Sequence, residues 1–225
     1  VKKHTNSLSN FPKINMGNKP VDGGNLLLSS SERDDLISQY PESNKYIKKL
    51  FSSNDFINGL IRFCLWIADD EREEAERIPF IKQRIEKTAK MRLKSPDEGA
   101  RNLALRPHQF REFNACNSET LIIPSTSSEN REYIPIDYAD NETIVTNAIY
   151  TVYDAPIWIF GIMTSKMYMI WINTIGGKLE SRYRYTNLCY NSFPFPKITE
   201  ARRTEIEQAA EAVLIAREMH TEKTL

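Results

Sequence analysis

The chain has 225 residues, enough for one substantial hydrophobic core with an appendage. Its 30 basic and 30 acidic side chains cancel, so no overall field marks it as a nucleic-acid binder, and only a local patch could do so. The three cysteines are odd in number and far apart, which argues against a disulfide framework or a zinc site and indicates reduced thiols in a cytoplasmic protein.

The N-terminal part is predicted to be a loop that leads into a helix. Residues 17–25 carry turn signals before a short apolar strand at 26–28. The backbone amides of such a loop could bind a phosphate, and a plain structural turn is the alternative, because neither the dinucleotide nor the Walker fingerprint is present. Serines at 29–31 then cap a helix that should end before Pro41. The N-terminus has no signal-peptide core, and because the chain starts at Val1 without an initiator Met, we expect a piece of a longer protein.

The next segment should form the first buried elements. We expect a short helix over residues 43–50, a turn at 54–59 and a buried strand over 61–67. The mixed charges of residues 69–77 indicate a solvated helix start and not a metal site, because arginines alternate with the acids.

A basic helix is predicted from Pro79 to about Lys94. Its cationic residues could follow a DNA phosphate backbone, or they could simply form the polar side of a surface helix. They are Lys82, Arg84, Lys87, Lys90, Arg92 and Lys94. Residues 101–111 then form an irregular basic connection.

Strand-type sequence follows from Thr120 to Tyr153. A polar loop over residues 125–131 interrupts it, and its hydroxyls, together with Arg131, suit phosphate and base-edge contacts. A solvated hairpin tip is the alternative for that loop.

Two further helices complete the prediction. Residues 157–173 are apolar nearly all round, which indicates a central buried helix packed on a sheet. Residues 199–219 form an amphipathic helix whose apolar stripe, from Ile206 to Leu214, needs a partner in this domain or in a helical region beyond it.

The segment 179–185 alternates charged residues with Leu and Tyr, as a strand with two different faces does. Glu180, Arg182 and Arg184 would project together, with the tyrosines on the opposite face. Arg suits guanine O6 and N7, and Glu accepts from the amino group of cytosine. A solvated edge strand with an internal Glu–Arg pair is the other interpretation of this alternation.

No catalytic constellation competes with this strand. The chain lacks the Gly-rich turn and the Asn-Pro-Pro-Tyr loop of an adenine methyltransferase, and it contains no Glu-x-Lys triplet of a metal-dependent nuclease. His4, His108 and His220 are scattered and suggest neither a triad nor a metal cluster. The residues alone therefore predict a non-catalytic binding module.

A series of blocks in fixed order resembles the target recognition domain of the MmeI-like (type IIG/IIL) restriction–modification enzymes. These blocks are Asn10-Phe11-Pro12-Lys13, Gly17-Asn18-Lys19-Pro20, Asp22-Gly23-Gly24-Asn25-Leu26-Leu27-Leu28, Phe63-Cys64-Leu65-Trp66, Ser127-Ser128-Glu129, Tyr133-Ile134-Pro135-Ile136, Leu179-Glu180-Ser181-Arg182-Tyr183-Arg184-Tyr185 and Asn191-Ser192-Phe193-Pro194-Phe195-Pro196. Such enzymes join an endonuclease, an adenine-N6 DNA methyltransferase, this domain and a helical region in one bacterial polypeptide. The resemblance covers nearly the whole chain.

The resemblance implies a set of DNA-contacting residues. Glu180 and Arg182 match a pair that co-varies with one recognised base pair. Arg184, Asn147 and Ala148 match readers of neighbouring pairs. The loop places Ser127, Ser128, Glu129 and Arg131 near DNA, with Glu129 at a base. We add Lys178 and Lys90 as backbone contacts.

We therefore expect an α+β fold with a mixed or antiparallel sheet, a buried central helix, flanking helices and a C-terminal helix. Residues 1–197 would form the DNA target recognition domain, and 198–225 would begin the helical region. The fragment would hold no cofactor, whereas the parent would use S-adenosylmethionine and Mg²⁺.

The partners of this fragment would be double-stranded DNA and the methyltransferase and nuclease domains of the same polypeptide, with no membrane. A protein-interaction domain that docks through the C-terminal helix is the alternative, and an RNA-binding domain is disfavoured because no aromatic stacking platform is evident.

Overall fold

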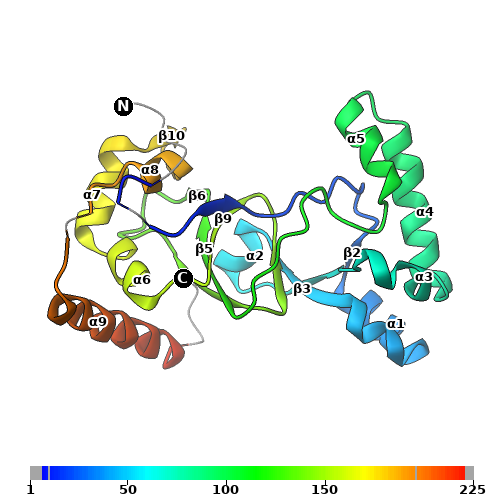
Figure 1. The fold of residues 1–225 in the computed structure, drawn as a ribbon, viewed down its shortest axis with the longest axis horizontal. Coiled ribbons are helices and arrows are strands. Elements are labelled where there is room, and N and C mark those ends of the chain that lie inside the picture. The colour runs from blue at the N-terminus through cyan, green and yellow to red at the C-terminus, as the bar shows by residue number, and fades with distance from the viewer. Residues whose placement is uncertain (1–6, 10, 196, 221–225) are drawn as a thin grey trace.

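A computed structural model describes residues 7–9, 11–195 and 197–220. Residues 1–6, 10, 196 and 221–225 lie outside the described residues, and with them His4, Asn10 and Pro196, which the sequence interpretation uses. The fold is mixed α+β, as predicted, with sheets in the middle of an elongated molecule and helices at both ends (Figure 1).

The first sheet is antiparallel and carries the larger core. Its strand order is β1 (Ile14–Met16), β9 (Ile149–Tyr153), β5 (Glu119–Pro124), β7 (Asp137–Asp140). Helices α6 (Ile157–Met163), α7 (Lys166–Ile175) and α8 (Asn187–Asn191) supply the other side of this core. Leu121 and Val152 of the sheet belong to the same buried cluster as Ile159, Tyr168 and Cys189 of the helices.

The second sheet lies toward the other end of the molecule. Its order is β2 (Leu27–Leu28), β4 (Arg62–Leu65), β3 (Ile47–Phe51), β8 (Thr143–Val145), with β3 and β8 parallel. Helix α1 (Ser30–Gln39) begins at a capping box in which Ser29 and Glu32 exchange hydrogen bonds, as the acidic first turn predicted. Short helices α3 (Arg72–Ala75) and α5 (Glu98–Asn102) flank α4 (Pro79–Leu93), and 3-10 turns cover Pro41–Tyr46, Asp69–Glu71 and Leu103–Leu105.

The predicted helix over residues 43–50 is wrong. Its second half belongs to strand β3, which lies between β4 and β8, and the side chains of Ile47 and Leu50 are buried in the core. Residues 47–50 have a weak helical spacing of apolar side chains, but pairing with β4 on one side and β8 on the other makes them a strand. The predicted turn at 54–59 is instead helix α2 (Ser53–Asn58), which Gly59 ends in a left-handed conformation (φ 64°).

The predicted single central helix is two helices. Ser165 caps α7 by accepting a hydrogen bond from the Tyr168 amide (3.2 Å), and Thr164 donates to the carbonyl of Phe160 (2.8 Å). These short hydroxyl side chains satisfy the backbone where the chain turns between α6 and α7. The expected burial is confirmed only in part: both helices contribute to the larger core, but Met167 and Ile170 of α7 are exposed.

The C-terminal helix α9 (Glu200–Glu218) packs across α6. Their contact is close at Gly161, where an added Cβ would lie 2.9 Å from Ile206 Cγ2 and 3.2 Å from Ala210 Cβ. Ala210 is buried, and Leu214 packs against the larger core. This domain thus supplies a partner for part of the stripe, at Ile206, Ala210 and Leu214, while Ala209 and Val213 stay exposed.

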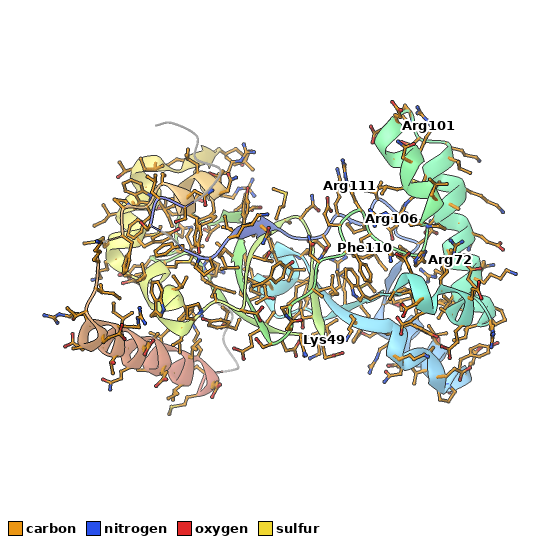
Figure 2. All side chains as sticks on the ribbon, in the orientation of Figure 1. Lys49, Arg72, Arg101, Arg106, Phe110 and Arg111 are labelled. Carbon is orange, nitrogen blue, oxygen red and sulfur yellow. The ribbon has the colours of Figure 1, made fainter. Side chains whose placement is uncertain are left out.

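Part of the basic helix is structural. Arg92 is fully buried, and all its N–H groups point to backbone carbonyls, so it cannot follow a phosphate backbone as α4 was expected to allow. Arg84 is bonded to Glu32 and to the carbonyl of Leu27. Figure 2 shows Arg101 on α5, and Arg106 and Arg111 on the connection that returns from α5 toward the sheets.

Two remaining sequence expectations concern the cysteines and the membrane. Cys64, Cys116 and Cys189 are free thiols, and burial raises the pKa of Cys64 well above its ordinary value. Among the residues that the structure describes, no helix has the length and apolar character needed to cross a membrane.

Candidate nucleic-acid interface

The predicted reading strand is a hairpin. Strands β10 (Gly177–Leu179) and β11 (Arg182–Arg184) pair antiparallel, and Leu179 lies opposite Arg182. Only Glu180 and Ser181 connect them, and Glu180 has a positive φ of 59°. The expectation of one continuous strand over 179–185 is therefore wrong at Glu180, which lies in the turn. The sequence obscured this because neither turn residue is a glycine.

A third strand completes this small sheet. Strand β6 (Thr126–Ser127) pairs with β11, so that Tyr183 lies opposite Ser127 and Arg184 opposite Thr126. Directly opposed residues point to the same face. The face with Tyr183 and Ser127 turns inward, since Tyr183 packs against the larger core and Ser127 is only 3 % exposed.

The opposite face of the small sheet presents the two arginines. Arg182 and Arg184 are exposed and two residues apart on β11, with Leu179 beside Arg182 and Thr126 beside Arg184. Arg182 donates from a guanidinium nitrogen to Glu180 Oε2 (2.7 Å), although Glu180 stands in the turn. Glu180 and Arg182 are thus in contact, which both the base-reading and the edge-strand interpretations allow, and Arg184 forms no ion pair with any residue that the structure describes.

Tyrosines on the inner side hold the strand. Tyr185 is buried, and its hydroxyl lies 2.6 Å from that of Tyr168 on α7. Burial raises the pKa of both phenols well above the ordinary value, so both remain protonated at neutral pH. The prediction that the tyrosines opposite the arginines fasten the strand to the core is confirmed.

Asn147 and Ala148 lie in the turn before β9, and backbone hydrogen bonds connect them with the hairpin. The Ala148 carbonyl accepts from the Ser125 amide (3.0 Å), and the Ser125 carbonyl accepts from the Tyr185 amide (2.9 Å). On the other side, the Asn147 amide donates to the Asn18 carbonyl (3.0 Å). Gly17 permits this approach, because a Cβ there would lie 2.3 Å from the Thr146 carbonyl oxygen. These bonds link Ala148 through Ser125 to Tyr185, the residue after Arg184, whereas Asn147 is bonded to Asn18.

The predicted DNA-contacting residues in and after β6 differ in how exposed they are. Ser127, the last residue of β6, is buried, so its hydroxyl cannot contact the DNA backbone and that prediction is wrong. Ser128 is half-buried and accepts from the Asn130 amide (3.2 Å). Glu129 is exposed, whereas Arg131 is half-buried and lines a cavity of about 980 Å³ beside α9.

The carboxylate of Glu129 accepts a hydrogen bond from Ser181 Oγ (2.6 Å) in the hairpin turn. This bond, with a backbone contact and the charges of Arg182 and Lys178, holds the pKa of Glu129 below its ordinary value, so it is ionised at neutral pH. Sequence reasoning missed this contact. The pairing of β6 with β11 creates it, and no local pattern in either segment signals that pairing.

Lys178 and Lys90 are both exposed, but they are far apart. Lys178 belongs to β10, next to the hairpin turn, and lies opposite Tyr183. Lys90 belongs to α4, and Figure 1 shows α4 and β10 at opposite ends of the molecule. Lys178 and Glu129 thus lie at the hairpin, whereas Arg131 lines the cavity beside α9 and Lys90 is at the other end of the molecule.

The chain matches known proteins over nearly its full length. The family described as "MmeI, target recognition domain" matches residues 1–197. The chain belongs to the MmeI target recognition domain family. A "DNA methyltransferase A" of Bacillus subtilis (strain 168) is 42 % identical to this family member over 219 residues, which is 97 % of the chain and 25 % of that protein.

Two solved structures share the fold of this chain. The type IIL restriction–modification enzyme MmeI in complex with DNA superposes with a TM-score of 0.94 at 38 % identity, covering 99 % of this chain and 30 % of that one. The type IIG restriction endonuclease BpuSI superposes with a TM-score of 0.50 at 9 % identity, covering 88 % and 25 %, and shares the fold alone. This MmeI-type domain thus spans about a quarter to a third of the length of the relatives it matches.

Proposed function

We propose that this MmeI-type domain reads a specific sequence in double-stranded DNA on behalf of a longer restriction–modification enzyme. The observation that carries the proposal is the outer face of β11. Arg182 and Arg184 stand exposed there, Arg182 already bonded to Glu180, while tyrosines on the inner side fix the strand. The relative solved with DNA has the same fold at a TM-score of 0.94, which supports a DNA partner.

Glu180 and Arg182 together suit one C·G base pair. A guanidinium has five N–H donors, so Arg182 can keep its bond to Glu180 and still donate to guanine O6 and N7. The second carboxylate oxygen of Glu180 is then available to accept from cytosine N4. Because the two side chains are already in contact, little side-chain order would have to be gained on binding.

The neighbouring residues extend the proposed contact surface. Arg184, Asn147 and Ala148 would read adjacent base pairs, since backbone hydrogen bonds hold their segments together. Ser128, Arg131 and Lys178 would contact phosphates near the hairpin. Lys90, on the distant α4, would add a weaker backbone contact.

The remaining activities would belong to the longer polypeptide. We propose that it holds S-adenosylmethionine and Mg²⁺ in methyltransferase and nuclease domains, and that this domain positions the methyltransferase over a target adenine. That base must leave the stack to react. Residues 198–225 would begin the helical region that follows the domain. Among the described residues of this chain, no group of three or more His, Cys, Asp or Glu is placed to hold a metal ion.

Selection from a randomised duplex pool tests the proposal. The 225-residue chain should enrich one motif that contains a C·G pair. Arg182→Ala should weaken binding to that motif by about 1–3 kcal/mol and relax preference at one position. An equal loss of binding to all sequences, with unchanged preference, would contradict base reading by Arg182.

A further inference from the structure

The outer face of the hairpin formed by β10 and β11 carries an apolar side chain beside its arginines. Leu179 ends β10 and is the ladder partner of Arg182 on β11, and directly opposed residues project to the same face. Leu179 is 44 % exposed. A leucine therefore stands in solvent next to the guanidinium group that is proposed to read guanine.

Leu179 is an exception to the two-faced pattern of this small sheet. On the inner face, Tyr183 packs against the larger core, whereas Leu179 belongs to none of the hydrophobic clusters of the described residues. In β6, β10 and β11, whose residues are all described, no other large apolar side chain is exposed. Single exposed leucines are common on protein surfaces, so exposure alone assigns no role. What distinguishes Leu179 is its place on the proposed reading face.

The backbone fixes Leu179 relative to the two predicted base readers. Pairing of Leu179 with Arg182 closes the two-residue turn, and an ion pair of 2.7 Å holds Arg182 to Glu180. Paired residues of an antiparallel ladder have Cα atoms about 4.5–5.5 Å apart, whereas successive base pairs of DNA are separated by about 3.4 Å. With Arg182 at one base pair, the Leu179 side chain therefore reaches a neighbouring pair in the same groove.

A leucine can distinguish base pairs through one feature of the major groove. Its side chain has no donor or acceptor, so it cannot bond to the polar edge atoms of the bases, and covering those atoms would cost free energy. The C5-methyl group of thymine is the apolar group that a base pair presents in the major groove. Packing of that methyl group against Leu179 would remove apolar surface of both groups from water.

We propose that Leu179 is a specificity-determining residue that packs against the C5-methyl group of a thymine in a base pair beside the one that Arg182 reads. The inference rests on the proposed function, and it adds an apolar contact to the hydrogen bonds expected of the arginines. A chain that selects a motif without sensing that methyl group would contradict this inference alone, so the two proposals can fail separately.

Deoxyuridine provides the probe, because it differs from thymidine only by the missing C5-methyl group. Each thymine of the motif that the wild-type chain selects is replaced in turn, and binding is measured by fluorescence titration. At one position, next to the pair that responds to Arg182→Ala, replacement should weaken wild-type binding about fourfold, as the loss of one buried methyl-sized group implies. Leu179→Ala should bind the two duplexes equally. Leu179→Met, which keeps an apolar side chain of similar volume, should retain the preference for thymidine.

Leu93→Ala is the matched control. Leu93 is 63 % exposed on α4, at the other end of the molecule from β10 (Figure 1), so the same substitution there should leave the fourfold effect unchanged. Thermal unfolding checks that every variant is folded at the temperature of the titration.

Three results overturn the proposal. The first is a selected motif with no thymine beside the pair that Arg182 reads, and the second is equal wild-type binding of every thymidine and deoxyuridine duplex. The third is a fourfold effect that persists in Leu179→Ala, because another residue would then contact the methyl group. A wild-type chain that selects no motif overturns the proposed function, and this inference with it.

Discussion

Two arginine-rich regions of this domain look alike in sequence and differ in what their guanidinium groups can do. On α4, Arg92 donates to the carbonyls of five residues and is fully buried. On β11, Arg182 donates to one carboxylate, and Arg184 makes no ion pair within the described part of the chain. An arginine can read DNA only with donors that the fold has left open, so the number of internal partners distinguishes the two regions.

The partners of Arg92 show why it is saturated. They come from the loop before β2 and from the connection after α5, at distances of 2.6–3.1 Å. These carbonyls belong to Pro20, Val21, Leu103, Arg106 and Gln109. Burial lowers the pKa of Arg92 to about 10, which still leaves it charged at neutral pH. One buried cation thus joins three segments: α4, the loop before β2 and the connection after α5.

The largest expected effect is on folding. Arg92→Met should destabilise the domain by about 3 kcal/mol or more, because it leaves several buried carbonyls without donors. Arg101→Met, which removes bonds to the exposed carbonyls of Ser95 and Pro96, should cost about 1 kcal/mol or less. Urea unfolding of both variants measures the difference. Equal losses would mean that burial of the guanidinium does not distinguish these sites.

The next effect is on DNA binding and leaves folding intact. Arg184→Ala should lose about 1–3 kcal/mol of binding to the selected motif and relax preference at a base pair next to the one that Arg182 reads. Fluorescence titration with duplexes changed at single positions measures this. Relaxed preference at the same pair for Arg182→Ala and Arg184→Ala would make the two arginines one reading unit and contradict separate roles.

A smaller effect concerns the inner side of β11. Tyr168→Phe should lower stability by about 1–2 kcal/mol, because it leaves the buried Tyr185 hydroxyl without its partner. Tyr183→Phe is the control, since Tyr183 is only half-buried on the same strand, and it should change stability by about 0.5 kcal/mol or less. Thermal unfolding compares them. Base preference should survive both substitutions, and its loss in Tyr168→Phe would show that this contact also sets the outer face.

Elements with a strong local signal could be predicted from the sequence. The capping box at Ser29 and the proline at the start of α4 mark helix beginnings chemically, and α9 follows from its long apolar stripe. The two faces of β11 follow from alternation with a period of two, which survives even though the strand is shorter than predicted. Local chemistry thus located the arginines and the tyrosines of the site.

What depends on distant pairing could not be predicted. Strand β3 exists because β4 and β8 lie on either side of it, and residues 47–51 alone fit a helix as well. The hairpin of β10 and β11 pairs with β6, which is some fifty residues earlier in the chain, and Glu129 after β6 accepts a hydrogen bond from Ser181 in the hairpin turn. The burial of Arg92 likewise requires two loops that are distant in sequence from α4, so the sequence of α4 does not reveal it.

The smallest effect tests the far end of the molecule. Lys90 is exposed on α4, the helix that also holds Arg92. The same helix therefore carries one cation whose donors are all used inside the protein and one that faces solvent. If Lys90 meets a phosphate, Lys90→Ala should weaken binding to every duplex by less than about 1 kcal/mol and flatten the dependence of log K on log salt by about one unit. Preference among sequences should stay the same, since a phosphate carries no base information. An unchanged salt slope would contradict a phosphate contact at Lys90 and remove that residue from the proposed interface.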